Sequence, residues 1–202
     1  INYLDHIEET GRDRPEFPTL FLKTQQSMVG HNQQLIRPKV SERFDFEGEF
    51  AVVIGKPGRY IQKEDWKNYV AGYSIIMDGS IRDFQQRSVD QGKNFYHSSS
   101  SGPWLVTLDE VPTDFSDMKL TTHLNGNIMQ ASDLDKLCFN AADLISYYSQ
   151  IFYFQPGDMI ATGTPGGVGS RREPPVWMKP GDELEVDITG IGTLKNMIVD
   201  EI

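Results

Sequence analysis

Cysteine is almost absent from this chain: Cys138 is the single example among 202 residues. A lone cysteine excludes a disulfide within the chain and fits a reducing compartment, so we expect a cytoplasmic location. The sequence also shows no secretory leader pattern and no apolar run of membrane length, and we therefore expect no membrane partner. Because the chain begins at Ile1 rather than at a methionine, we expect further residues upstream, where an organellar signal could lie.

Basic residues are also in short supply. The chain has 19 Lys and Arg against 29 Asp and Glu, a formal net charge of −10, and no basic run. Nucleic-acid surfaces need clustered positive charge to neutralise phosphates, so we expect no nucleic-acid partner. Hydrophobic residues make up 38% of the chain and charged residues 24%, proportions that are ordinary for a soluble globular protein. We expect a single domain over residues 1–202.

The most informative stretch is residues 44–55, whose aromatic and β-branched content predicts a strand. Alternate side chains of a strand share a face, so Glu47 and Glu49 would project together with Asp45 beside them. For an isolated pair of glutamates, a solvated strand face is the simpler interpretation. Here residues 50–54 are all apolar, which predicts burial of the second half of the strand on both faces. Carboxylates that enter a core in this way need a cation.

A third carboxylate follows the next predicted strand. Residues 70–77 form a second, mostly apolar run, and Asp78 comes directly after it. Glu47, Glu49 and Asp78 together would form a site made only of oxygen ligands. Such a site suits a hard divalent cation, Mg²⁺ or Mn²⁺ with Ca²⁺ as a further option, and does not suit zinc. We therefore predict a divalent metal ion held by these three residues.

Two further segments carry candidate chemistry. Residues 5–10 predict a short helical turn that ends at Gly11, and on this turn His6 and Glu9 face the same way. On spacing alone, an exposed His–Glu pair is the simpler interpretation. The glycine-rich segment 162–169 lacks the Gly-Lys-Ser/Thr ending of a phosphate-binding loop, so it does not predict a nucleotide site. Its glycines would instead let backbone N–H groups approach a ligand closely.

Several remaining segments have clear local signals. The pair Asn125-Gly126 predicts the turn of a β-hairpin over residues 119–130. Residues 182–194 alternate apolar and polar side chains, which predicts a second antiparallel pair. The one clear helix is predicted over about residues 140–152, with Asn140 as its N-cap.

Two short segments complete the prediction. Residues 19–23 are expected to form a strand, and the serine run 98–101 is expected to be a mobile loop. Because strands dominate, we predict a mostly β (α+β) fold in which mixed sheets form a roll around a central metal site.

These segments resemble the fumarylacetoacetate hydrolase family along essentially the whole chain. The motifs that carry the resemblance are residues 45–55 (DFEGEFAVVIG), 69–73 (YVAGY), 78–85 (DGSIRDFQ) and 157–169 (GDMIATGTPGGVG). The resemblance implies the β-roll of the family's catalytic domain and a homodimer. It also implies an enzyme of the acylpyruvase or 2-hydroxyhepta-2,4-diene-1,7-dioate isomerase branch, active in the breakdown of aromatic compounds.

The resemblance further implies roles for individual residues. His6 and Glu9 would activate water. The side chains that would contact a bound oxyacid are Lys93, which is also a catalytic residue, Arg82, Gln85, Thr164 and Lys23. After Lys23 the family usually continues with proline, whereas residues 24–26 here are Thr-Gln-Gln, so the pocket wall is expected to differ.

The predicted reaction follows from the predicted cation. A 2-oxo acid chelates a divalent ion through its carboxylate and keto oxygens, and the ion then stabilises the enolate. We expect a hydrolase that cleaves a C–C bond in a 2,4-dioxo acid, such as an acylpyruvate, fumarylpyruvate or fumarylacetoacetate. The same site would also serve an isomerase, tautomerase or decarboxylase of 2-hydroxymuconate-like or oxaloacetate-like acids. A catalytically silent carboxylate-binding protein is the third interpretation.

Overall fold

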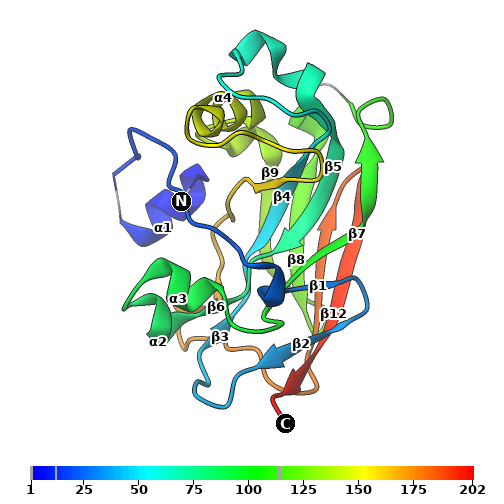
Figure 1. Cartoon of the computed structure of the whole chain (residues 1–202). Helices are drawn as coiled ribbons and strands as arrows, with labels where there is room; N and C mark the ends of the chain where they lie inside the picture. Colours follow the sequence, from blue (N-terminus) through cyan, green and yellow to red (C-terminus); the bar gives the residue numbers. More distant parts are fainter. Residues whose placement is uncertain (1, 12, 113–114) are drawn as a thin grey trace.

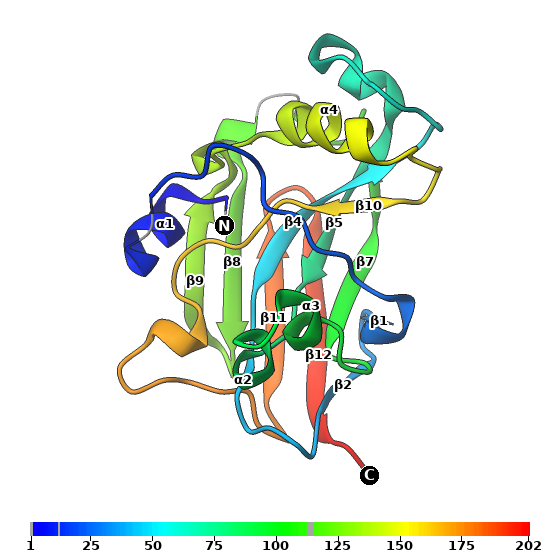
Figure 2. The same cartoon turned by 60° about the vertical axis from the view of Figure 1, so that its left-hand side comes forward.

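The computed structural model describes residues 2–11, 13–112 and 115–202. Two five-stranded sheets form most of it, and each contains both parallel and antiparallel pairs (Figure 1, Figure 2). The first sheet has the order β1 (Met28–Gly30), β7 (Ser99–Thr107), β5 (Val70–Met77), β4 (Gly48–Ile54) and β10 (Met159–Ala161). The second has the order β2 (Gln34–Arg37), β12 (Gly192–Asp200), β11 (Glu183–Ile188), β8 (Lys119–Leu124) and β9 (Asn127–Asp133). The predicted mostly β fold with mixed sheets is confirmed.

Short elements complete the fold. A two-stranded sheet pairs β3 (Phe44–Asp45) with β6 (Ser80–Ile81). The α-helices are α1 (Leu4–Thr10), α2 (Arg82–Gln85), α3 (Val89–Lys93) and α4 (Ala141–Ile151). The 3₁₀-helices are η1 (Gln25–Ser27), η2 (Lys63–Tyr69), η3 (Phe115–Asp117), η4 (Leu134–Lys136) and η5 (Gly169–Arg171). In Figure 2, α4 crosses one end of the sheets, and α2 and α3 lie toward the other end. Among the described residues, no helix has the length and apolar character needed to cross a membrane.

Burial along the strands shows where the core lies. Every residue of β4 is buried, as its apolar run predicts. In β11 buried and half-buried residues alternate, so one face of this strand packs on the core and the other is partly open to solvent. β4, which carries Glu49, is therefore an inner strand of the molecule.

The clearest local predictions are confirmed. The hairpin of β8 and β9 turns at Asn125 and Gly126, whose φ angles of 51° and 76° are those that a tight hairpin turn needs. α4 begins after Asn140, whose side chain accepts a hydrogen bond from the Asp143 backbone N–H at 3.1 Å. The Asp143 carboxylate accepts the Asn140 backbone N–H at 3.0 Å, which completes a capping box.

The strand predicted over residues 44–55 is interrupted. β3 pairs with β6 and β4 pairs with β5, and the chain changes sheet at residues 46–47. The Phe46 backbone N–H is bound by the Asp45 carboxylate at 2.8 Å, and this local bond replaces a strand-to-strand bond. Glu47 therefore lies just before the regular strand, not within it.

The prediction of a mobile loop at the serine run is wrong. Ser99 to Ser101 form the start of β7, and the side chains of Ser98 to Ser100 are fully buried. The chain passes so close to Gly79 that a Cβ atom there would lie 1.7 Å from the Ser98 carbonyl oxygen. Only glycine fits at position 79 for such an approach, and the buried serine hydroxyls have internal partners: Ser99 Oγ accepts the Gly79 N–H at 3.0 Å.

The short strand predicted at residues 19–23 is also absent, and the segment is irregular. Its carbonyl groups are bound by side chains instead of by a neighbouring strand. The Thr19 carbonyl accepts the Tyr148 hydroxyl at 2.9 Å, and the Leu22 carbonyl accepts the Asn94 amide at 2.8 Å. These contacts hold the segment across α4 and α3 and bring Lys23 toward the predicted metal ligands.

Candidate active site

The three predicted metal ligands meet because β4 and β5 are antiparallel. Gly48 pairs with Met77, so the start of β4 lies beside the end of β5. The Asp78 backbone N–H donates to the Glu47 carbonyl at 2.8 Å. As a result, carboxylate oxygens of Glu47, Glu49 and Asp78 lie within 4.8 Å of one another. We call these three residues the carboxylate cluster.

Three positive side chains surround this cluster. Lys93, at the end of α3, places its Nζ atom 2.6 Å from Glu47 Oε2 and 2.6 Å from Asp78 Oδ2. Lys23 Nζ lies 2.9 Å from Asp78 Oδ1, and Arg82 Nη2 lies 2.7 Å from Glu47 Oε1. Lys93 is only 2% exposed, so its charge is screened little by water. The ion pairs therefore form an internal network, not a surface one.

The network shifts the pKa values of the two glutamates in opposite directions. Burial by itself would raise the pKa of Glu47, but the positive charges of Lys93 and Arg82 outweigh it and hold that pKa below its ordinary range. Burial, together with the negative charges of Asp78 and Glu47, raises the pKa of Glu49 to about 8. Without a bound cation, Glu47 is therefore ionised at neutral pH while Glu49 retains its proton.

The donor set fits a hard divalent cation. All three ligands are buried carboxylates, which is the oxygen-only chemistry that Mg²⁺, Mn²⁺ and Ca²⁺ prefer. In the part of the chain that the structure describes, no lysine or arginine forms an ion pair with Glu49. Its Oε2 atom accepts the backbone N–H of Gly163 at 2.7 Å. Glu49 is thus the member of the cluster whose charge most needs a metal ion.

Asp45 does not belong to the cluster. Its Oδ1 atom accepts the backbone N–H groups of Phe46 and Gly169, each at 2.8 Å, and Oδ2 accepts that of Ser170 at 2.9 Å. Oδ2 also lies 2.7 Å from two nitrogens of Arg82. Because its oxygens are all committed, Asp45 ties the end of the glycine-rich segment to Arg82 instead of facing a metal ion.

The helical turn with His6 and Glu9 is confirmed as α1, which ends at Gly11 with a φ of 63°. His6 Nδ1 lies 2.8 Å from Glu9 Oε2, and His6 is 8% exposed. The other oxygen, Glu9 Oε1, accepts the backbone N–H of Gly167 at 2.9 Å. His6 is therefore buried, whereas Glu9 lies at the surface with its carboxylate held by the glycine-rich segment.

The glycine-rich segment thus donates N–H groups to two carboxylates of the protein itself. Gly163 binds Glu49 and has a φ of 100°, a conformation that side chains rarely allow. Gly167 binds Glu9 and has a φ of 96°. Approach of this segment to a ligand stays a prediction, and the groups that these two N–H groups bind are Glu49 and Glu9.

The predicted substrate contacts also have protein partners. Arg82 Nη1 donates to Gln85 Oε1 at 2.8 Å, in addition to its bonds with Asp45 and Glu47. The Thr164 hydroxyl donates to the Gly48 carbonyl at 2.9 Å. Lys23 Nζ donates to Ser99 Oγ at 2.7 Å and to the Lys93 carbonyl. Lys23 and Arg82 contact the cluster directly, Thr164 bonds to the residue between its two glutamates, and Gln85 bonds to Arg82. Contact with a substrate stays a prediction for each.

Sequence reasoning missed Gln130, a buried residue of β9 whose amide bonds to Gly48 and to Thr164. These partners lie 82 and 34 positions away along the chain, so no local pattern marks the residue. The hairpin signal places Gln130 on a strand and says nothing about what its side chain contacts.

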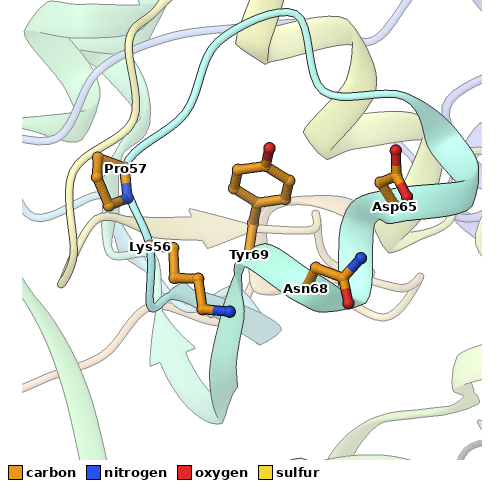
Figure 3. A pocket seen from close by; sticks show the side chains of 5 residues that line it. All are labelled: Lys56, Pro57, Asp65, Asn68 and Tyr69. Carbon is orange, nitrogen blue, oxygen red and sulfur yellow. The ribbon is translucent and has the colours of Figure 1, made fainter.

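A surface hollow lies apart from these residues. It has a volume of about 530 Å³ and lies beside η2 (Figure 3). Its lining residues are Lys56, Pro57, Asp65, Asn68 and Tyr69. No predicted site residue lines it, so we assign it no part in the candidate chemistry.

Comparison with known proteins adds a family and its activities. A family model described as the C-terminal part of fumarylacetoacetate (FAA) hydrolase matches residues 1–199. The chain is 41% identical over 202 residues to the mitochondrial oxaloacetate tautomerase Fahd2a of Rattus norvegicus. The match covers 98% of this chain and 64% of that protein, so the chain spans less than two thirds of the length of this relative.

Solved structures share the fold. The chain is similar to 5-carboxymethyl-2-hydroxymuconate delta-isomerase from Mycobacterium smegmatis, with a TM-score of 0.87 and 34% identity over 100% of this chain and 77% of that one. It is also similar to maleylpyruvate hydrolase from Sphingobium sp. SYK-6, a structure in complex with manganese(II) and pyruvate. That TM-score is 0.84, with 27% identity over 100% of this chain and 69% of the other. Similar proteins thus include a tautomerase, an isomerase and a hydrolase.

Proposed function

Because this chain belongs to the fumarylacetoacetate hydrolase family of enzymes, we propose that it is a divalent-metal-dependent tautomerase of a small 2-oxo acid such as oxaloacetate. The observation that carries the proposal is the carboxylate cluster with its ring of positive side chains. The choice of an oxaloacetate-like acid rests on the 41% identical relative, which is an oxaloacetate tautomerase.

Glu47, Glu49 and Asp78 would hold the metal ion, which when bound supplies a Lewis acid for the negative oxygens of a 2-oxo acid. Lys93 and Lys23 place two ammonium groups against the same cluster. Their positive charge favours an anionic acid near the cluster, because charge-assisted hydrogen bonds to carboxylates are strong. The protein's net charge of −10 would otherwise oppose such a ligand.

His6 is the residue proposed to move the proton. Keto–enol conversion takes a proton from the carbon beside the keto group and places a proton on the keto oxygen. With Nδ1 facing Glu9, the other ring nitrogen of His6 is left to take up and return that proton. Glu9 orients the ring, and the Gly167 N–H fixes Glu9 in turn.

Hydrolysis of a C–C bond in a 2,4-dioxo acid is the second candidate. It is favoured by the same His6–Glu9 pair, because a histidine held by a carboxylate can also remove a proton from water. The maleylpyruvate hydrolase of similar fold shows that proteins of this shape include hydrolases. Isomerisation and decarboxylation of related acids use the same enolate-stabilising chemistry. Analysis of the products distinguishes these reactions from tautomerisation and hydrolysis.

The deciding experiment compares two substrates with the metal-stripped protein, with and without added Mg²⁺ or Mn²⁺. Faster loss of the enol absorbance of oxaloacetate, only with metal and without pyruvate release, supports the tautomerase. Equal amounts of pyruvate and acetate from acetylpyruvate support the hydrolase, and pyruvate with CO₂ from oxaloacetate supports a decarboxylase. Metal-dependent binding of pyruvate or oxalate with no turnover of either acid contradicts all three and leaves a carboxylate-binding protein.

We also propose that the chain acts as a homodimer, as its family resemblance implies. Sedimentation equilibrium of the purified chain measures this directly. A mass twice that of one chain supports the homodimer, and a mass of one chain contradicts it.

A further inference from the structure

We propose that Gln130 is a positioning residue that holds the carboxylate cluster and the glycine-rich segment in one fixed geometry. Gln130 is 1% exposed and lies on β9, an edge strand of the second sheet. The inference rests on the proposed function, because a fixed geometry matters for a site that binds a metal ion and a substrate. It concerns a side chain with no assigned role in the proposed proton transfer or metal binding.

The Gln130 amide bonds to both parts of the site at once. Its Oε1 atom accepts the Gly48 backbone N–H at 3.0 Å, and Gly48 is the residue between the two glutamates of the cluster. Its Nε2 atom donates to Thr164 Oγ1 at 2.8 Å and to the Pro165 carbonyl at 2.9 Å. Both donors and one acceptor of the amide are therefore used, which fixes its orientation. The Gln130 side chain therefore joins the ligand strand to the glycine-rich segment, beside the direct Thr164–Gly48 and Gly163–Glu49 bonds between them.

Thr164 and Pro165, the two residues of the glycine-rich segment that Gln130 binds, lie between the two N–H groups that hold carboxylates of the site. Gly163 binds Glu49 just before them, and Gly167 binds Glu9 just after them. A shift of the intervening residues would therefore move both a proposed metal ligand and the proposed proton-transfer pair. Displacements of about 1 Å can reduce turnover by roughly 100-fold in a precisely aligned site.

A second contact, next to Gln130, also holds the glycine-rich segment against β9. Arg172 donates from Nε to the Gly167 carbonyl at 3.1 Å and from Nη2 to the Met129 carbonyl. A Cβ atom on Gly167 would lie 2.2 Å from that same Met129 carbonyl oxygen. The segment thus contacts β9 at two neighbouring residues, Met129 and Gln130, and Gln130 alone of the two also bonds to Gly48 of the ligand strand.

The chain offers a matched control for loss of a buried amide. Asn196 is 2% exposed, donates to the carbonyls of Gly30 and Gln33 at 2.9 and 2.8 Å, and accepts the Ser100 hydroxyl at 2.7 Å. It is therefore about as buried as Gln130 and also donates two hydrogen bonds and accepts one, yet none of its partners is a predicted site residue. Gln130→Met and Asn196→Leu both replace an amide with an apolar group of similar length.

The experiment measures four quantities for the unmodified chain and for both variants: Tm, the Mn²⁺ affinity of the metal-free protein by calorimetry, and kcat and KM for the enol of oxaloacetate. Both variants should lower Tm to a similar extent. Gln130→Met should weaken Mn²⁺ binding or lower kcat by about 10-fold to 100-fold, as loss of groups that orient metal ligands does. Asn196→Leu should leave Mn²⁺ affinity and kcat close to those of the unmodified chain.

If Gln130→Met does not fold, Gln130→Asn takes its place, since it keeps the amide but is too short to bridge both partners. The inference is overturned if a Gln130 variant keeps Mn²⁺ affinity and kcat as well as Asn196→Leu does. If the unmodified chain binds Mn²⁺ but does not convert the enol, the proposed function fails on its own. The Mn²⁺ affinities then decide the role of Gln130 without reference to turnover.

Discussion

Lys93 and Glu47 form a buried ion pair at the centre of the site, with Nζ 2.6 Å from Oε2 although the two residues lie 46 positions apart. The same Nζ atom also reaches Asp78. Burial would lower the pKa of Lys93, but the charges of Asp78 and Glu47 outweigh that effect and raise it. Lys93 is therefore positively charged at neutral pH, and it compensates carboxylates that a metal ion would also neutralise.

Replacing Lys93 should consequently make the fold depend on metal. Lys93→Met leaves Glu47 and Asp78 without their shared cation, and removal of one partner from a buried pair costs about 3–5 kcal/mol. We expect this loss in the free energy of unfolding with EDTA present, and a smaller loss with saturating Mn²⁺. Urea denaturation under both conditions measures it, and Lys63→Met, at an exposed ion pair on η2, is the control. Equal losses with and without metal would contradict the prediction.

The pH dependence of the metal-free protein should follow Glu49. Burial, with the negative charges of Asp78 and Glu47, raises the pKa of Glu49 to about 8, whereas its ordinary value is 4.5. The folded state then binds a proton more tightly than the unfolded state, so stability falls as pH rises from 4.5 toward 8. Denaturation in EDTA across this range measures the slope. Glu49→Gln, which cannot ionise, should flatten it, and an unchanged slope in this variant would exclude Glu49 as its source.

The His6–Glu9 pair should affect turnover and not metal binding. Loss of a positioned acid–base group lowers kcat by about 10²-fold to 10⁴-fold, and we expect this for His6→Gln. Mn²⁺ affinity should stay near that of the unmodified chain, because neither residue belongs to the carboxylate cluster. Glu8→Gln, at an exposed neighbour on the same helix, is the matched control. A normal kcat in His6→Gln would remove His6 from the mechanism.

Gly79 should not tolerate a side chain. A Cβ atom there would lie 1.7 Å from the Ser98 carbonyl oxygen, and Gly79 directly follows Asp78. Overpacking of this kind costs about 1–3 kcal/mol or more, and we expect Gly79→Ala to lower Tm and weaken Mn²⁺ binding together. Gly30→Ala is the control, since its nearest neighbour would be 3.6 Å away. Similar Tm and affinity in the two variants would contradict the close approach.

The sequence was sufficient to predict the carboxylate cluster because its signals are local. Glu47 and Glu49 precede one apolar run and Asp78 ends another. Such runs form neighbouring inner strands, and the antiparallel pairing of β4 with β5 then brings the acids together. The hairpin at Asn125 and the cap at Asn140 were predictable for the same reason, since turn and cap residues act on the backbone beside them.

Features that depend on distant contacts were not predictable. By its position in the sequence, Asp45 resembles a further acid of the cluster. Its carboxylate instead accepts the backbone N–H of Gly169, which lies 124 positions away. The serine run has the composition of a loop, but its hydroxyls bond to groups far away along the chain, as Ser99 Oγ does with the Gly79 N–H. Whether a polar side chain is buried and hydrogen-bonded depends on the distant residues that pack against it. Short-range sequence patterns do not contain that information.

The glycine-rich segment has a further consequence for how the site forms. Gly167 and Glu9 meet across 158 positions, and Gly163 and Glu49 across 114. Contacts of such high contact order close late in folding, because the chain must first lose the entropy of long loops. A fragment that lacks residues 1–11 cannot form the Gly167–Glu9 bond, and one that ends before residue 162 can form neither bond. Divalent-ion affinity would therefore serve as a gauge of folding, because it should reach its full value only after the glycine-rich segment has docked on Glu49.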